Sequence, residues 1–180
     1  MQAFKQLYLE LANKVADIEG IKWVDLWHNQ INFLEDEHQF PAPAVFLSFR
    51  SLAIDDLAEN IQEVNLQIEV YLFYETFADT YKGSINQDSA LEFIELMEQI
   101  HIALHATIGT HYDNMRRVGF SAVDTGGAGN LYQTVFECQF VDLSAKKLYI
   151  EAETDEVNIT NNNDVPDAVV TGFENMFDPQ

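Results

Sequence analysis

Two histidines, His101 and His105, stand four residues apart in a stretch with helical periodicity, a spacing that can direct two imidazoles at one metal ion. His111 follows shortly after them. The residue after His101 is isoleucine, so the glutamate that a zinc protease uses as its general base at that position is missing. We therefore expect partly buried helix histidines and no metal site.

The single cysteine, Cys138, is the only thiol that could act as a nucleophile, and it excludes a disulfide within the chain. It alternates with Phe136 and Phe140, which predicts a position on the core face of a strand. An apolar setting raises the pKa of a thiol and lowers its reactivity. A Cys-His pair needs only proximity in space and is the alternative, but we favour a buried structural cysteine.

Glycines gather at Gly126, Gly127 and Gly129, a composition that also occurs in phosphate-binding loops. No Lys-Ser or Lys-Thr pair follows them, and the next element has a strand pattern, which favours a hairpin tip. The acidic pair Asp55-Asp56 and the acidic run 35–37 lack the alternating oxygen spacing of a calcium loop. We therefore predict no catalytic residue, no metal ligand and no cofactor-binding residue, and hence no enzyme.

Arg116 and Arg117 are adjacent in a chain that has only nine Lys and Arg residues. A guanidinium group pairs with carboxylates through two parallel hydrogen bonds, so an arginine pair suits an acidic partner surface. An acidic patch on a neighbouring copy and a salt bridge within the chain are equal alternatives.

The elements that must position these residues alternate between helical and strand patterns. Apolar residues at helical spacing predict a helix over 4–18, and Gly20 follows where a C-cap glycine would lie. Strand-like composition follows over 21–27, with a possible short hairpin partner over 31–34. Pro41 and Pro43 lead into another strand over 44–49.

The strongest strand pattern alternates over residues 62–76. Its polar face becomes apolar at Tyr71 and Phe73, so this end must be covered by another element or by a partner. Ser89, three residues before a glutamate, has the spacing of a capping box, and helical periodicity continues from there to Gly109. Strands over 118–123 and 131–143 then flank the glycines as a hairpin.

This order predicts an α+β fold with a mostly antiparallel β-sheet and two α-helices packed on one face. We assign residues 1–147 to this domain. Residues 148–180, with eight acidic and no basic side chains, form a C-terminal arm that is flexible or becomes ordered on assembly.

The charge balance of the whole chain narrows the function. The 180 residues include 9 basic and 30 acidic side chains, a formal charge of −21, which excludes nonspecific DNA binding by counterion release. A hydrophobic fraction of 47% indicates a folded chain. Charges throughout the first twenty residues argue against a secretory signal, and we expect neither a membrane-spanning helix nor membrane binding.

The element order and several stretches of sequence resemble the tail-terminator, or tail-completion, proteins of long-tailed bacteriophages and prophages. The resemblance covers about residues 1–147 and rests on IKWVDLW, PAPAVFLSF, SALEFIELMEQIHIALH, MRRVGF and NLYQTVFECQF. It implies a structural virion protein that forms a homo-oligomeric ring, usually a hexamer, on the tail tube. Such a ring ends tube polymerisation and joins the tail to the neck. Its partners would be the tail-tube protein and the head connector, in the virion and, during assembly, in the host cytoplasm.

A ring of six copies would carry a formal charge of −126, so an acidic lumen would let DNA pass without holding it. The residues that we expect at contacts with a neighbour or the tube are four aromatics, the arginine pair and the glycine tip: Tyr71, Phe73, Phe77, Tyr81, Arg116, Arg117, Gly126, Gly127 and Gly129. Packing of the aromatics within the chain, under the 77–87 loop, is the alternative. Alternative functions are another neck or head-closure component, or a stand-alone acidic protein-binding module.

Overall fold

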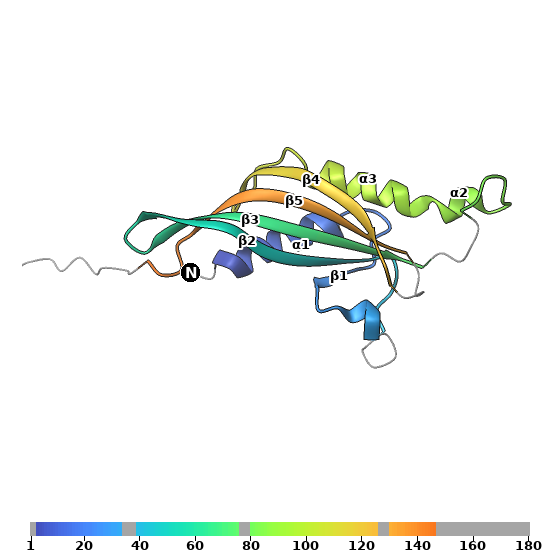
Figure 1. Cartoon of the computed structure of the whole chain (residues 1–180), viewed down its shortest axis with the longest axis horizontal. Helices are drawn as coiled ribbons and strands as arrows, with labels where there is room; N and C mark the ends of the chain where they lie inside the picture. The colour runs from blue at the N-terminus through green and yellow to red at the C-terminus, as the bar shows by residue number, and fades with distance from the viewer. Residues whose placement is uncertain (1–2, 34–38, 76–79, 126–129, 147–180) are drawn as a thin grey trace, which may run out of the picture. The chain divides into compact units, whose positions relative to one another are not determined.

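The structure, a computed structural model, describes residues 3–33, 39–75, 80–125 and 130–146. One mixed sheet has the strand order β1-β2-β3-β5-β4 and carries α1 and α3 on one face (Figure 1). Its strands are β1 (Trp23–Leu26), β2 (Ala44–Ala58), β3 (Ile61–Tyr74), β4 (Asp113–Val123) and β5 (Asn130–Asp142). The helices are α1 (Ala3–Ala16), the 3-10 helix η1 (Gln30–Phe33), α2 (Gln87–Ala90) and α3 (Glu92–Leu104). This confirms the predicted α+β fold.

The main core lies between the helices and the sheet. The alternating apolar residues of β3 point into it, and residues at helical spacing on α1 and α3 pack against them. Cys138 on β5 is buried in the same core, as the sequence predicts. The buried residues from these elements include Leu7, Leu11, Val15, Val64, Leu66, Ile68, Val70, Ile100, Leu104, Phe136 and Phe140.

The segment between β1 and β2 differs from the prediction. The expected short hairpin partner over 31–34 is wrong for residues 31–33, which belong to η1. The side chain of the buried Gln30 accepts a hydrogen bond from the backbone N–H of His28 and donates one to the carbonyl of Leu26, each at 2.7 Å. These bonds fix a local turn, and β1 pairs in parallel with the start of β2 instead of with a hairpin neighbour.

The second predicted helix is shorter and is interrupted. It is divided at Leu91 into α2 and α3, and Ser89 lies inside α2, so Ser89 does not cap α3. The predicted end at Gly109 is wrong because α3 ends at Leu104. Residues beyond it turn back toward β4, where the backbone N–H of Ala106 donates to the carbonyl of Met115 at 2.8 Å.

β2 is much longer than the predicted strand over 44–49. It continues to Ala58 and forms a long antiparallel hairpin with β3, whose turn includes Asn60 in the left-handed region at φ 61°. Figure 1 shows this hairpin projecting beyond the start of α1. The first four residues of β2 are buried, whereas Arg50 and every later residue of the strand are exposed.

Candidate functional site

His101 on α3 and His105, the residue that follows its end, lie close together, but the described residues place no third ligand beside them. The ring centroids of His101 and His105 are 4.6 Å apart. Burial, Arg117 and His105 lower the pKa of His101, in that order of size. Nδ1 of His105 accepts the backbone N–H of Arg117 at 3.1 Å. No group of three or more His, Cys, Asp or Glu residues in the described part of the chain is placed to hold a metal ion.

His111, which the sequence places near this pair, belongs to a different contact. Its Nδ1 lies 2.8 Å from the carboxylate of Glu10 on α1. The structure therefore divides the three histidines between two locations.

Cys138 is packed where it cannot act as a nucleophile. Its side chain is buried in the main core between the sheet and the helices. Burial raises the pKa of its thiol to about 12, so almost none of the reactive thiolate exists near neutral pH.

Tyr71 and Phe73 are packed within the chain, on the face of the sheet opposite to the helices. Tyr71 is 8% exposed and Phe73 is 2% exposed. The ring of Trp27 stacks on Tyr71 with centroids 4.3 Å apart, and Phe40 packs edge-to-face against Phe73 at 5.8 Å. Neither aromatic presents a free surface in the isolated chain. Among the described residues, this cover comes from the segment between β1 and β2. Residues 77–79 of the 77–87 loop, the alternative cover that the sequence suggested, lie outside the described residues.

We call Trp27, Phe40, Tyr71 and Phe73 the aromatic cluster. The Tyr71 hydroxyl is part of a small polar network at the edge of this cluster. It donates to Oε2 of Glu69 at 2.8 Å and accepts from Nε2 of Gln133 at 2.9 Å. Burial and the neighbouring carboxylate raise the pKa of Tyr71 to about 12. Two of the predicted contact residues thus have a structural role in the folded chain.

The other predicted contact residues differ in their surroundings. Tyr81 is 66% exposed. Arg116 reaches Oε2 of Glu137 at 3.3 Å in an exposed ion pair, and the guanidinium of Arg117 lies 5.8 Å from the ring centre of Phe120. Phe77, Gly126, Gly127 and Gly129 lie outside the described residues, as does the predicted arm 148–180.

The outer part of the β2–β3 hairpin carries a surface that the sequence pattern did not reveal. Leu52, Ile54 and Leu57 are 47%, 52% and 55% exposed, and the carboxylates of Asp55 and Asp56 lie between them in sequence. The described residues therefore leave three large aliphatic side chains of this hairpin about half exposed. We call Leu52–Leu57 the hairpin patch.

The opposite edge of the sheet has a second such surface. Val118 and Phe120 on β4 are exposed, Phe120 to 63%, and they follow Arg116 and Arg117 directly. We call Arg116–Phe120 the β4 patch. Both patches combine exposed apolar side chains with a pair of like charges, acidic on the hairpin and basic on β4.

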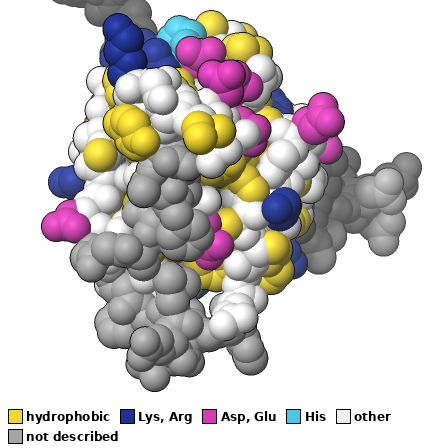
Figure 2. Space-filling view, turned by 90° about the vertical axis from the view of Figure 1, so that its right-hand side faces the viewer, with side chains coloured by type: hydrophobic (Ala, Val, Ile, Leu, Met, Phe, Trp, Pro, Cys, Tyr) yellow, Lys and Arg dark blue, Asp and Glu magenta, His cyan; other side chains and the backbone are white. Residues whose placement is uncertain are grey.

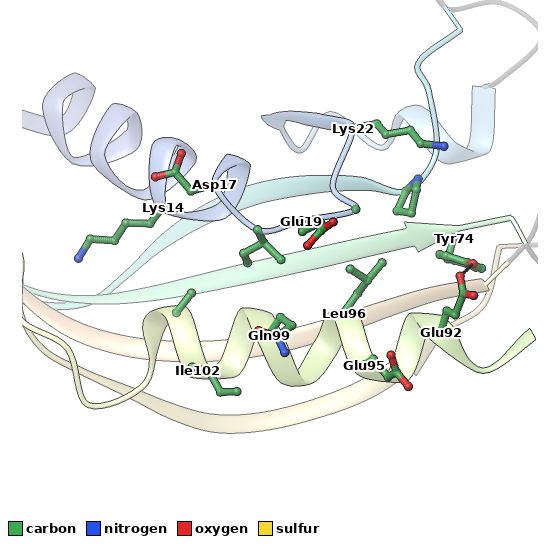
Figure 3. A pocket seen from close by; sticks show the side chains of 14 residues that line it. Lys14, Asp17, Glu19, Lys22, Tyr74, Glu92, Glu95, Leu96, Gln99 and Ile102 are labelled. Atoms are coloured by element: carbon green, nitrogen blue, oxygen red, sulfur yellow. Dashed lines mark hydrogen bonds between the residues drawn. The ribbon is translucent and has the colours of Figure 1, made fainter. Parts of the chain in front are cut away.

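A groove of about 950 Å³ lies between the end of α1 and α3 (Figure 3). Acidic, basic and apolar side chains alternate around it, and the Tyr74 hydroxyl donates to Glu92 at 3.2 Å across one end. The described residues that line the groove do not form a convergent set of polar groups of the kind that fixes a small ligand. Its labelled lining in Figure 3 is Lys14, Asp17, Glu19, Lys22, Tyr74, Glu92, Glu95, Leu96, Gln99 and Ile102.

The end of the molecule away from the hairpin turn has a mixed surface. Figure 2 shows carboxylates, basic groups and hydrophobic side chains interspersed there, without one continuous apolar area among the coloured atoms. No helix in the described ranges is both long enough and apolar enough to cross a membrane. Because they expose large apolar side chains, the two edge patches are the best candidate functional sites among the described residues.

Comparison of the chain with models of protein families and with curated proteins finds no match.

Proposed function

We propose that the chain is a structural subunit of a tail-terminator ring of a phage or phage-like particle. In this role it caps the tail tube, ends its polymerisation and offers a surface to the neck. The hairpin patch is the observation that carries the proposal, because a subunit that assembles must present apolar surface that its own fold leaves uncovered. That this assembly is a tail-terminator ring is inferred from the sequence resemblance.

The surface chemistry of the sheet supports a ring through which DNA passes. Beyond the aromatic cluster, the face without helices carries polar side chains in cross-strand rows. Gln67 lies between Arg50 and Glu137, and Glu63 lies opposite Asp55. A hydrated surface with several carboxylates does not hold DNA phosphates, so we assign this face to the lumen.

A terminator ring would have two protein partners. The tail-tube protein would bind one rim of the ring and a head-connector protein the other, in the virion and, during assembly, in the host cytoplasm. The acidic surface would allow DNA to pass without specific binding.

Mass photometry and negative-stain electron microscopy of the purified chain test this function. We expect rings with one central opening, and binding of such rings to the ends of tubes formed by the tail-tube protein encoded with it. A chain that stays monomeric over a wide concentration range and leaves tube ends unchanged would exclude a terminator and favour a stand-alone binding module.

A further inference from the structure

The sheet ends in two free edges. β1 pairs only with residues Ala44 to Leu47, so no other strand in the described ranges pairs with the outer edge of β2 from Ser48 to Ala58. On the other side, the segment after α3 contacts the outer edge of β4 as far as Arg117. From Val118 to Val123, no described segment pairs with that edge. Free edges of this kind readily accept a strand from another chain.

We propose that the outer edge of β2 in one copy pairs with the Val118–Val123 edge of β4 in the next copy, so that the sheet continues from subunit to subunit. This inference rests on the proposed ring and names the surface that closes it. The occupant of each edge is a second copy of the same chain.

Strand direction agrees with such a junction. β2, β3, β5 and β4 are each antiparallel to the next strand in the sheet, so β2 and β4 run in opposite directions. A neighbour that continues the sheet around a ring keeps its strand directions. Its β4 therefore runs antiparallel to the β2 beside it, which gives a regular antiparallel ladder.

One large apolar side chain of each patch, Ile54 and Phe120, lies on the same face of the sheet. Ile54 is paired with Val64, which points into the main core. Phe120 is paired with Thr134, which is paired in turn with the core residue Val70. Ile54 and Phe120 are therefore both on the helix-bearing face, where a continued sheet brings them toward each other and buries them.

The charges on the two edges are complementary. When Ser48 lies opposite Val123 in an antiparallel junction, the ladder ends with Ala53 opposite Val118, the last free position of the β4 edge, and the acidic pair Asp55-Asp56 lies just beyond it, near the arginine pair Arg116-Arg117. The ion pair of Arg116 with Glu137 is exposed and contributes little stability, so Arg116 can pair across the junction instead. Carboxylates and guanidinium groups at such a rim set the register and exclude wrong partners.

The same charges disfavour symmetric pairing of like edges. Two β2 edges would bring two acidic pairs into one short junction, and two β4 edges would bring two arginine pairs together. The favoured contact is therefore between different edges, a head-to-tail arrangement that closes into a ring when the rotation fits.

A charge exchange tests the junction. One variant carries Asp55→Arg with Asp56→Arg, and the other carries Arg116→Asp with Arg117→Asp. Each variant alone has like charges at every junction, so we expect monomers at concentrations where the wild type forms rings. In an equimolar mixture, a ring with an even number of copies in which the two variants alternate has opposite charges at every junction, and we expect such rings to return in mass photometry.

Matched control variants show whether a loss of rings comes from the junction, from the change in net charge or from unfolding. Asp17→Arg with Glu19→Arg makes the same charge change as the first variant, and Lys5→Asp with Lys22→Asp the same as the second. All four residues are exposed and lie outside both edges, so these controls should form rings. Circular dichroism melting checks that each variant is folded.

The outcomes distinguish the inference from the proposed function. Wild-type rings that persist in both charge variants would overturn the edge junction and leave the terminator function standing. Rings lost in both variants but not restored in the mixture would overturn pairing between the two different edges. A wild type that neither forms rings nor binds tube ends would overturn both proposals.

Discussion

The carboxylate of Glu10 lies 2.8 Å from Nδ1 of His111, 101 positions further along the chain. The same carboxylate accepts the backbone N–H groups of Thr110 at 2.9 Å and of His111 at 3.0 Å. Through these bonds α1 holds the turn between α3 and β4. That turn belongs to the segment that contacts the outer edge of β4, so the contact also helps to determine how much of the edge stays free.

Replacing Glu10 with glutamine should lower the free energy of unfolding by about 1–2 kcal/mol. The amide keeps one acceptor oxygen but loses the charge that strengthens three hydrogen bonds. Urea unfolding followed by circular dichroism measures the change. The exposed Glu95 on α3 provides the control, since Glu95→Gln should stay within about 0.5 kcal/mol of the wild type. Equal effects of the two substitutions would contradict the role of Glu10.

The Glu10 carboxylate should also make the free energy of unfolding depend on pH in the acidic range. Burial alone would raise the pKa of Glu10, but the hydrogen bonds from His111 and Thr110 and the charge of Lys14 lower it below the ordinary value of 4.5. A lowered pKa in the folded chain contributes stability that is fully present above 4.5 and is lost as the pH falls through the folded-state pKa. The stability difference between wild type and Glu10→Gln should therefore shrink below pH 4.5. A difference that stays constant from pH 7 to pH 3 would disprove this linkage.

Phe73→Ala should lower the free energy of unfolding by about 3–5 kcal/mol, because it leaves a cavity in a closed aromatic cluster. Tyr81→Ala should change it by less than about 0.5 kcal/mol, since that side chain is exposed. Thermal unfolding of both variants separates the two roles. If Phe73→Ala were as stable as Tyr81→Ala, Phe73 would not be a structural core residue.

The sequence predicted the layers of the fold because its strongest signals come from core burial. Alternation along β3 and β5 and helical spacing along α1 match the buried residues closely. The outer half of β2 was missed for a physical reason. Register shifts at Leu52 and Leu57 interrupt its two-residue period, and Asp55 and Asp56 lack the apolar character of a strand.

The remaining differences between the predicted and the observed elements come from local hydrogen bonds and from the positions of neighbouring elements. The side chain of Gln30 fixes the turn before η1, and no hydrophobic pattern records such a bond. The helical spacing of Ile108 extends past the true end of α3, where Thr107 Oγ1 donates to the carbonyl of Leu104 at 2.6 Å. The exposure of the hairpin patch depends on the position of α1 in space. The hairpin projects beyond the start of α1 at Ala3, so this helix does not cover the patch, and the sequence pattern alone does not show this.

The thiol of Cys138 should not react with a disulfide reagent in the folded protein. With a pKa of about 12, only about 10⁻⁴ of the thiol is ionised at pH 8, and the side chain is also shielded from solvent. Absorbance of the released thiol anion should show no reaction over an hour in buffer and one equivalent in denaturant. Rapid reaction of the native chain would contradict the buried position and revive the Cys-His alternative.

Replacing apolar side chains of the hairpin patch should weaken ring formation but change the stability of the single chain only slightly. Ile54→Ser with Leu57→Ser should leave the unfolding free energy within about 1 kcal/mol of the wild type, because both side chains are half exposed in the single chain.

Ring formation should nevertheless weaken about tenfold or more, since the substitutions remove the apolar contact that the next copy would bury. Leu66→Ala is the matched contrast: it removes a side chain on the same hairpin that points into the main core, and it should cost about 2–5 kcal/mol of stability. Concentration series in mass photometry, combined with urea unfolding, measure both quantities. Unchanged assembly of the Ile54→Ser, Leu57→Ser variant would show that the hairpin patch is not a contact between subunits.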